Sequence, residues 1–438
     1  MSLRLSSRIA LVVYLVFFNL LLPLGVALFL PVLLLVRKRR KTLFQRLGFQ
    51  HYPEVNGSGC KPVWIHALSV GELLSCIPLL KELREQLPDR PFFLSVSTLA
   101  AYDIAKERAF AHVNGLFYFP YDLLPSVRRC LNKIRPALFL LIETDIWPCF
   151  LMEARRLRIP CFLLNGRLSP RSLKFSQSFS ALFTQAFKTF ARIYPQSALE
   201  REHFLSVGVE EHKISHAGNL KFDLRDPLPS SEIIAELRRG TGLREKDHVF
   251  LAGSTHRGEE AILRSTFLAL RQHHPELKLL IVPRHPRRSD DIKRIFAGDP
   301  LRIALFSQGP NPEADVTVVD RMGLLSGLYA LADVAFVGGS LVRQGGQNPI
   351  EPAAAGKPVL FGSDMSDFPE VSRLLVEAGG AIQVNNPSEL TEQCSRLLAD
   401  RELARAMGVR ASNAVREHQG TSQRLTAEIV AFLETHQE

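Results

Sequence analysis

The sequence predicts an α/β protein made of two doubly wound halves behind an N-terminal membrane-spanning helix. Three observations support this prediction. Apolar runs of strand length alternate with helical stretches, a Pro- and Asp-rich stretch interrupts the alternation near the middle, and an uncharged apolar segment begins the chain. Such alternation is typical of parallel sheets that are covered by helices on both faces. The length of 438 residues suits two or three domains.

The N-terminal segment is predicted to be a membrane anchor. No charged residue occurs from Ile9 to Val36, a run of 28 residues, whereas a spanning helix needs about 20 apolar residues. The basic run Arg37–Lys41 follows, and the positive-inside rule then places the rest of the chain in the cytoplasm. We therefore assign residues 1–41 to an anchor and its basic flank. A cleaved signal peptide, a helix lying flat on the membrane and a hairpin turning at Pro23 are the alternatives.

The net charge of +10 comes mostly from this segment. The first 50 residues hold eight basic and no acidic residues, which leaves 46 basic against 44 acidic residues in the remainder. A nucleic-acid-binding protein concentrates Lys and Arg along its binding surface. The nearly neutral body therefore argues against nucleic acid as a partner.

The elements of the body follow one another in βα order. The first domain, residues 42–228, begins with a strand at Pro62–Leu68, a turn and a helix at Glu72–Leu87. A linker covers Asp223–Ser231, and the second domain spans residues 229–420, followed by a helical segment at 421–438 that is expected to return to the first domain. The further strands are predicted at Phe92–Ser97, Ala137–Ile142, Cys161–Leu164, Val249–Ala252, Leu279–Val282, Val316–Val319, Val334–Val337 and Pro358–Phe361.

Several classes of site find no support in the sequence. The six cysteines are dispersed without a C-x-x-C pair, so neither a zinc site nor a disulfide framework is expected, and reduced thiols are the simplest interpretation. The chain lacks a P-loop and a clean G-x-G-x-x-G motif, which disfavours kinases and dehydrogenases. It also lacks the D-x-D pair that holds a metal beside a nucleotide sugar. We therefore expect no metal and no cofactor.

Acidic residues follow two strands of the first half. Glu72 ends the turn Ser69-Val70-Gly71-Glu72 at the start of a helix, and Glu143 directly ends an apolar strand. The carboxyl ends of parallel strands are where such sheets bind ligands. As alternatives, Glu72 stabilises its helix N-terminus and Trp147 simply packs in the core.

Cations and Gly-rich loops suggest an anionic ligand. Arg167 and Lys221 lie in loops that contain glycine, although solvated surface cations are commoner than binding ones. In the second half, Ser254-Thr255-His256 opens a helix after a strand, so its backbone N–H groups are candidates for holding an anion. Pro283 stiffens the end of another strand, where Arg284 follows it. Glu351 lies in the first turn of a helix that comes after a second Gly-rich turn. Each loop alone is better explained as an ordinary βα turn, and this explanation weakens when the loops are taken together.

These motifs together match one family. The sequence resembles the 3-deoxy-D-manno-oct-2-ulosonic acid (Kdo) transferases of lipopolysaccharide synthesis along essentially its whole length. The matching residues are His66 with Ser69-Val70-Gly71-Glu72, Tyr118–Asp122, Glu143-Thr144 with Trp147-Pro148, Asn165 with Arg167-Leu168-Ser169, Leu220-Lys221-Phe222-Asp223, Ser254-Thr255-His256 with Gly258-Glu259-Glu260, Val282–Pro286, Phe336–Leu341 with Gly345-Gly346, and Asn348-Pro349.

The resemblance implies a GT-B fold, in which two Rossmann-like domains face a cleft and bind the acceptor and CMP-Kdo respectively. It implies inverting, metal-independent transfer of one or more Kdo units to lipid IV-A at the bacterial inner membrane, with the catalytic body in the cytoplasm. Glu72 would be the general base, with Glu143 and Lys221 supporting the transition state. The residues implied in substrate binding are Ser69, Gly71, Arg167, Ser254, Thr255, His256, Pro283, Arg284, Met322, Gly323, Leu324, Asn348, Pro349, Ile350 and Glu351.

Two positions depart from the family pattern. Leu324 stands where an acidic residue is usual, and Gln347 stands where many members have histidine. Both departures concern contacts with the nucleotide. The alternative functions are a glycosyltransferase that uses a UDP-sugar, a sugar-nucleotide epimerase, and a membrane-tethered binding protein without catalysis.

Overall fold

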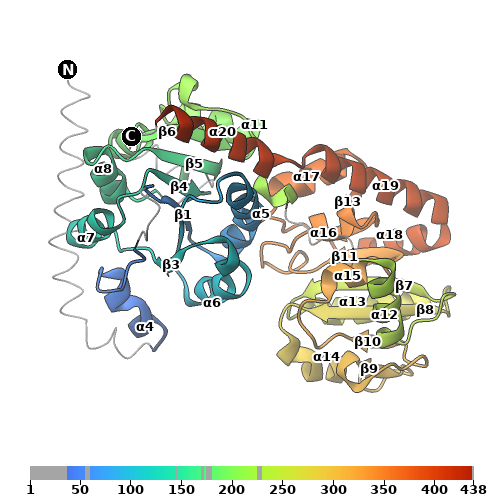
Figure 1. Cartoon of the computed structure of the whole chain (residues 1–438). Coiled ribbons are helices and arrows are strands. Elements are labelled where there is room, and N and C mark those ends of the chain that lie inside the picture. The colour runs from blue at the N-terminus through green and yellow to red at the C-terminus, as the bar shows by residue number, and fades with distance from the viewer. Residues whose placement is uncertain are drawn as a thin grey trace. The chain divides into compact units, whose positions relative to one another are not determined.

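The structure is a computed structural model that describes residues 37–54, 60–143, 146–168, 172–173, 180–223 and 229–436. It divides into two compact units, one comprising Met1–Leu224 with Gln419–Glu438 and the other Arg225–His418. The boundary at Leu224 falls inside the stretch that the sequence suggests as a linker. Each unit is built around its own parallel sheet (Figure 1).

The first unit has a six-stranded sheet in the order β3-β2-β1-β4-β5-β6, and every neighbouring pair is parallel. This is the strand order of the Rossmann fold. Strands β2 and β3 are added on one side of β1 and strands β4 to β6 on the other, so the strand order switches between β1 and β4. The strands are β1 Val63–Ala67, β2 Phe92–Val96, β3 Gly115–Tyr118, β4 Leu138–Ile142, β5 Cys161–Gly166 and β6 Phe190–Pro195. The helices are α4 Arg37–Arg46, α5 Val70–Gln86, α6 Leu99–Arg108, η2 Phe110–His112, α7 Leu124–Ile134, α8 Pro148–Arg156, α10 Ser180–Phe187, α11 Ala198–Ser206, η3 Glu211–Lys213, η4 Leu220–Asp223 and α20 Thr421–Thr435.

Both faces of this sheet are buried. Figure 1 shows α7 and α8 on one side of the strands and α5 and α6 on the other. Because successive side chains of a strand point to opposite faces, Trp64 of β1 enters one core and Val63 and Ile65 enter the other. The strands are accordingly near-continuous apolar runs, as sheets covered on both faces require.

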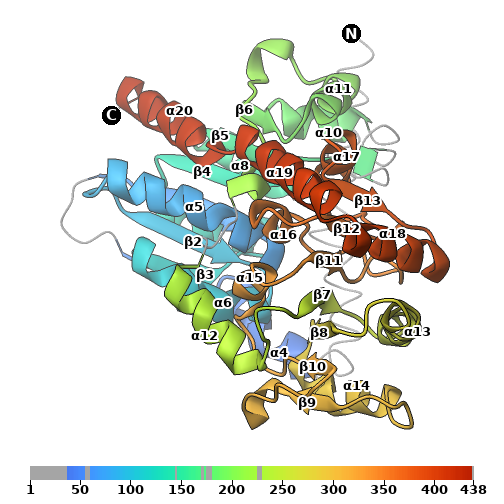
Figure 2. The same cartoon turned by 90° about the vertical axis from the view of Figure 1, so that its right-hand side faces the viewer.

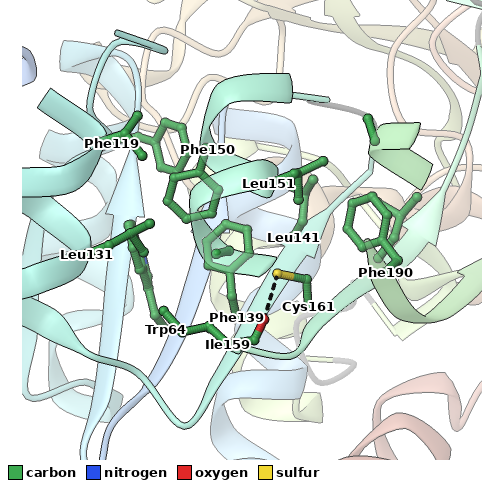
Figure 3. Packing of buried hydrophobic residues seen from close by; sticks show 14 of the residues in the cluster. Trp64, Phe119, Leu131, Phe139, Leu141, Phe150, Leu151, Ile159, Cys161 and Phe190 are labelled. Carbon is green, nitrogen blue, oxygen red and sulfur yellow. Dashed lines mark hydrogen bonds between the residues drawn. The ribbon is translucent and has the colours of Figure 1, made fainter. Parts of the chain in front are cut away.

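Aromatic rings fill the core beneath α7 and α8 (Figure 3). The Trp64 ring centroid lies 5.0 Å from that of Phe139 and 5.2 Å from that of Phe150, both in edge-to-face arrangements. Its indole N–H donates to Ser95 Oγ at 2.8 Å, so the buried polar atom has a partner. This core holds the carboxyl ends of β1 and β4 in a defined position.

The C-terminal helix α20 belongs to the first unit, beside α5 (Figure 2). Its buried residues Leu425, Ile429 and Leu433 join the core that contains the buried side chains of α5. Asp223 caps this helix, because its Oδ1 accepts from Gly420 N at 2.8 Å and its Oδ2 from Ser422 N at 2.6 Å. Residues on both sides of the second unit thus belong to one domain.

The second unit has a seven-stranded parallel sheet in the order β13-β12-β11-β7-β8-β10-β9. The strand order of this sheet switches between the neighbouring strands β7 and β11. The strands are β7 His248–Thr255, β8 Leu277–Pro283, β9 Ile303–Leu305, β10 Val316–Val318, β11 Val334–Val337, β12 Val359–Phe361 and β13 Ala381–Gln383. The helices are α12 Ser231–Thr241, α13 Glu259–Arg271, η5 Pro286–Arg288, α14 Ser289–Ile295, η6 Phe306–Gln308, α15 Leu325–Tyr329, α16 Ile350–Ala354, α17 Pro369–Glu377, α18 Pro387–Ala399 and α19 Arg401–Glu417.

The strands predicted from the sequence are all present, and four others were missed. β3 and β9 are short, β6 contains Arg192 and ends in Pro195, and β13 is only partly buried. None of the helices that the structure describes is long and apolar enough to span a membrane. The anchor predicted at Ile9–Val36 lies outside the described residues.

Candidate active site

In the first unit, the sheet reverses its strand order between β1 and β4. Ligands of such sheets bind outside the carboxyl ends of the strands at this switch point. The chain leaves β1 through Leu68 and Ser69 into α5, and it leaves β4 through Glu143. Two of the predicted site residues, Glu72 and Glu143, therefore follow the two strands that flank the switch point.

Glu72 occupies the first turn of α5 and takes part in its cap. Ser69 is the N-cap residue, and its Oγ accepts from Glu72 N at 3.3 Å. In return, Glu72 Oε1 accepts from Ser69 Oγ at 3.1 Å and Oε2 accepts from Leu68 N at 2.7 Å. This arrangement is close to a capping box. The side chain of Glu72 therefore stabilises the N-terminus of α5, as the alternative interpretation of this residue holds. Gly71 is exposed and has open space beside it.

Glu143 and Lys221 form an ion pair. Lys221 Nζ lies 3.2 Å from Glu143 Oε1, and the two side chains are only 12% and 13% exposed. The structure thereby brings into contact two residues to which the resemblance gives the same role. Glu143 has a φ of 63°, which is unusual for a residue with a side chain, and its N–H donates to Leu164 O at 2.9 Å.

Asn165 holds the Lys221 segment against the end of β5. Its side-chain Oδ1 accepts from Leu220 N at 3.0 Å, and Asn219 Oδ1 accepts from Lys221 N at 3.0 Å. Asn165 is 1% exposed and has a φ of 56°. Asparagine tolerates this left-handed conformation better than most residues. The position of the Lys221 ammonium thus depends on a buried amide two strands away from β1.

Arg167 follows β5 and is partly buried. The next residue, Leu168, donates its N–H to Glu200 Oε2 at 2.7 Å. Glu200 is itself buried, and burial raises its pKa, while the Leu168 N–H, His203 and the charge of Arg167 oppose that rise. The positive charge of Arg167 therefore favours the ionised form of the Glu200 carboxyl by opposing the rise of its pKa.

His66 has a role that spacing did not reveal. It is fully buried in β1, stacks on Phe119 with ring centroids 3.9 Å apart, and places Nδ1 3.0 Å from Ser95 O. Because a carbonyl oxygen only accepts, Nδ1 carries the proton and Nε2 is an acceptor. Burial, with a smaller contribution from the charge of Arg46, lowers the pKa of His66 to about 3, although the hydrogen bond to Ser95 opposes the decrease.

Buried polar atoms without a hydrogen-bond partner collect at the carboxyl edge of the same sheet. His66 Nε2, Ser97 Oγ, Trp147 Nε1 and Asn165 Nδ2 are among those found in the described part of the chain. Buried polar groups are ordinarily paired, so several such atoms at one edge are consistent with a polar ligand. Trp147 also ends the loop before α8, as its N-cap residue. Its neighbour Asp145 lies outside the described residues.

At the switch point of the second unit, Glu259 ties two loops together. Its Oε2 accepts from His256 N at 2.9 Å and from Gly339 N at 2.7 Å, and its Oε1 accepts from Ser340 N and Leu341 N, both at 3.1 Å. The side chain is fully buried. The sequence predicts that backbone N–H groups of the Ser254–His256 loop hold an anion. One of them, His256 N, binds the protein's own carboxylate in this structure, together with three N–H groups of the loop after β11.

Glu260, the next residue, binds a third loop. It pairs with Arg288 through two hydrogen bonds of 2.8 and 3.0 Å, and its Oε1 also accepts from Thr255 Oγ1 at 3.0 Å. Arg288 belongs to the segment that follows β8. The loops after β7, β8 and β11 are therefore linked through two consecutive carboxylates.

Arg284 and His256 lie next to each other at this edge. Arg284 N donates to Thr255 O at 3.1 Å, and the Arg284 guanidinium makes no hydrogen bond or ion pair within the part of the chain that the structure describes. Burial lowers the pKa of His256, and the neighbouring His285 and Arg284 lower it further. The same loop carries Pro283 at its start, and Ser254 adopts a φ of 54° beside it.

The segment from Asn348 to Glu351 is preorganised by its own side chains. Asn348 Oδ1 accepts from Ile350 N at 3.0 Å, and Asn348 Nδ2 donates to Glu351 Oε1 at 3.2 Å. Pro349 is the N-cap residue of α16, so Glu351 lies in the first helical turn. Gln347, which replaces the usual histidine, places its Nε2 3.3 Å from His256 Nε2.

The residues Met322, Gly323 and Leu324 lie in the turn before α15. Met322 is 67% exposed, Gly323 has a φ of 82°, and Leu324 packs against the core as the N-cap residue of α15. No cluster of His, Cys, Asp and Glu suited to a metal ion occurs in the described ranges.

Residues 41–224 match the family described as 3-deoxy-D-manno-octulosonic-acid transferase (kdotransferase). The chain is 31% identical over 405 residues to the 3-deoxy-D-manno-octulosonic acid transferase of Haemophilus influenzae, an alignment that covers 90% of this chain and 92% of that one. The chain belongs to the Kdo transferase family. The enzyme of the same name from Bordetella pertussis is 32% identical over 378 residues, with 83% of this chain and 85% of that one covered. The resemblance noted in the sequence is thus confirmed, and the chain is a glycosyltransferase of lipopolysaccharide biosynthesis.

Solved structures confirm the GT-B-like α/β fold of this Kdo transferase family member. The UDP-GlcNAc 2-epimerase of Neisseria meningitidis, bound to UDP-GlcNAc, has a TM-score of 0.56 at 15% identity, with 83% of this chain and 100% of that chain covered. HepE of Anabaena, in complex with UDP and glucose, has a TM-score of 0.56 at 15% identity, with 86% and 100% covered. At such identities the likeness concerns the fold alone.

Proposed function

We propose that this protein transfers one or more Kdo units from CMP-Kdo to lipid IV-A, with inversion at the anomeric carbon and without a metal ion. The observation that carries the proposal is the placement of Glu72 after β1 and Glu143 after β4, at the switch point of the first sheet, in a member of the Kdo transferase family. The first unit binds the acceptor and the second unit binds the donor.

Glu72 is the proposed general base. A sugar hydroxyl is a poor nucleophile, and a carboxylate within reach removes its proton as the new bond forms. The contacts from Leu68 N and Ser69 Oγ orient the Glu72 carboxylate at the carboxyl end of β1, where the acceptor is proposed to bind.

Glu143 and Lys221 are the proposed supports of the transition state. Their ion pair keeps a cation at the edge of the acceptor site, where it stabilises negative charge that develops during transfer. Arg167, Ser69 and Gly71 are proposed to contact the acceptor. Of these, Arg167 suits the phosphate groups of a lipid A precursor, because a guanidinium binds phosphate through two parallel hydrogen bonds.

The donor is proposed to lie along the strand ends of the second sheet. The phosphate of CMP departs as an anion, and the Arg284 guanidinium, unpaired within the described residues, is placed to neutralise it. His256 adds a neutral imidazole at the same edge. The other residues proposed to contact CMP are Ser254, Thr255, Pro283, Met322, Gly323, Leu324, Asn348, Pro349, Ile350 and Glu351.

We also propose that the protein is anchored in the bacterial inner membrane by residues 1–41, with its body in the cytoplasm. The support is the uncharged run Ile9–Val36 with the basic run after it. The next residues suit a membrane surface, because Phe44 and Phe49 are 61% and 65% exposed and the Arg129 guanidinium lies 4.3 Å from the Phe49 ring centroid. Protease protection in membrane vesicles tests the orientation, and a body on the periplasmic side would contradict it.

The decisive experiment incubates the purified full-length protein with lipid IV-A and CMP-Kdo generated in situ. A Kdo-lipid product detected by mass spectrometry is the expected result, and it also counts the Kdo units. Parallel reactions contain EDTA, or a UDP-sugar in place of CMP-Kdo. Consumption of the UDP-sugar without any Kdo-lipid product would replace the proposal with the alternative glycosyltransferase or epimerase.

A further inference from the structure

The second sheet carries a buried carboxylate with an unusual set of partners. Both oxygens of Glu259 accept from backbone N–H groups, four in total, and the residue has no solvent exposure. The donors come from two loops that are 80 residues or more apart in the sequence, one after β7 and the other after β11. These two strands flank the switch point, where nucleotides bind in folds of this kind.

Successive N–H groups around a left-handed residue form a concavity that binds anions. Here Gly339, Ser340 and Leu341 present consecutive N–H groups, and Gly339 has a φ of 72°. Glu259 already fills this concavity. The phosphate of a nucleotide is therefore not bound by these three N–H groups, and the carboxylate instead takes the place of an anion inside the protein.

The carboxylate acts between two loops that are in direct contact. A Cβ atom on Gly338 would lie 2.6 Å from Ser254 O and 2.7 Å from Thr255 Cα, so only glycine fits there. Close approach of two backbones brings their dipoles together, and the four N–H groups converge on one point. A negative charge at that point stabilises the approach, because hydrogen bonds to a charged acceptor are about twice as strong as neutral ones.

We propose that Glu259 is a positioning residue whose carboxylate serves as a built-in anion that fixes the nucleotide-binding edge of the second sheet. This inference rests on the proposed function only in that the second unit binds the donor nucleotide. Glu259 would not touch the donor. It would act through His256 and the Gly338–Leu341 loop, whose places it sets, and so would govern donor affinity rather than the chemical step.

Replacement of Glu259 by alanine should leave four backbone N–H groups without the carboxylate that they bind. Four N–H groups would then face a small cavity, which formate fits in size and charge. We expect Glu259→Ala to weaken CMP binding by at least about tenfold, equivalent to about 1.4 kcal/mol, and millimolar formate to restore most of that loss. In Glu259→Gln, the glutamine side chain fills the cavity and turns its NH2 group toward the N–H donors. Formate should therefore not restore CMP binding to this variant.

The experiment is calorimetric titration of the full-length protein with CMP, with formate compared against chloride at equal ionic strength. Glu377→Ala is the matched control, because Glu377 is an exposed partner of Arg373 on α17 and should respond to neither change. The inference is overturned if Glu259→Ala binds CMP within threefold of the wild type, or if formate restores Glu259→Gln as well as Glu259→Ala.

A second variant keeps the inference testable if Glu259→Ala does not fold. Glu259→Asp retains the charge and withdraws it by one methylene, so the KM for the donor should rise at least fivefold while the KM for the lipid acceptor stays unchanged. An unchanged donor KM would overturn the inference. If the wild type binds UDP and not CMP, the proposed donor is wrong, and the same titrations with UDP then test Glu259 independently.

Discussion

Lys221 Nζ lies 3.2 Å from Glu143 Oε1, at the edge of the first sheet where β4 ends. The pair joins a residue in a left-handed backbone conformation to a short 3-10 helix that a buried asparagine holds in place. Backbone conformations of this type cost about 1–3 kcal/mol and persist where the surroundings enforce them. The energetic cost of this backbone conformation is consistent with a functional requirement for the position of the Glu143 side chain.

Loss of either partner of this pair should reduce transfer sharply. Lys221→Met removes the cation beside Glu143, and Glu143→Gln removes the carboxylate beside Lys221. We expect each to lower kcat at least about a hundredfold, as loss of one group that stabilises a transition state does. The double variant should show a coupling of about 1–3 kcal/mol between the sites in a double-mutant cycle of kcat. Strictly additive effects would show that the residues act separately.

Glu72→Gln is a sharper test of the base than Glu72→Ala. Glutamine can still accept from Leu68 N through its carbonyl oxygen and donate its NH2 group to Ser69 Oγ, so the cap of α5 persists, whereas alanine loses both contacts at a cost of about 1 kcal/mol. We expect Glu72→Gln to reduce transfer at least about a hundredfold while CMP binding remains within twofold. Steady-state kinetics and calorimetry measure the two quantities. Residual activity within about tenfold of the wild type would remove Glu72 as the base.

Arg284→Gln should weaken donor binding. An arginine without a partner among the described residues, next to a neutral His256, is placed to meet a phosphate. We expect the Kd for CMP to rise at least about tenfold, with a much smaller change for cytidine, which lacks the phosphate. Arg287→Gln is the matched control, since Arg287 is an exposed neighbour in the same loop. Equal losses in both variants would indicate a general electrostatic effect.

His66 should make the stability of the first unit dependent on pH. Burial lowers its pKa to about 3 in the folded state, against about 6.5 when unfolded. The unfolded chain therefore binds the proton more tightly, and the contribution of His66 to stability, complete above pH 6.5, falls as the pH drops toward 3. Between pH 8 and pH 5 the loss amounts to about 2 kcal/mol.

Urea unfolding at the two pH values measures this loss by tryptophan fluorescence. Both tryptophans of the chain, Trp64 and Trp147, lie in the first unit, so the signal reports on that unit. His66→Gln lacks the titrating group, and its unfolding free energy should decrease by about 2 kcal/mol less than that of the wild type. A pH dependence that is identical in the two proteins would rule out the shifted histidine.

Much of the fold could be predicted because the strong strands are long apolar runs. β1, β2, β4, β7 and β8 are buried on both faces, so their sequences carry few polar residues. The strands β6 and β13 interrupt that pattern with charge, proline or exposure. The helical segment 421–438 is expected from the sequence to return to the first domain, and α20 does so. Which of its residues meet the core depends on contacts between residues far apart in the chain, which local patterns do not contain.

The candidate site was predictable residue by residue but not as an arrangement. The acid after β4 and the lysine in the Gly-containing loop are visible in the sequence, whereas their contact requires the fold. Glu259 is visible in the sequence only as part of a motif, and an acid in the first turn of a helix indicates no more than a favourable interaction with the helix N-terminus. His66 was missed as a titrating group because burial, rather than spacing, determines its pKa.

The return of α20 to the first core has a consequence for synthesis on the ribosome. Leu425, Ile429 and Leu433 complete the apolar layer over α5, and they follow the whole second unit, Arg225–His418, in the chain. Domains generally fold as units while the chain emerges. The second unit is therefore translated before these residues appear, so the core of the first unit is completed after the second unit has been made. Until then the apolar surface of α5 lacks the cover that α20 provides.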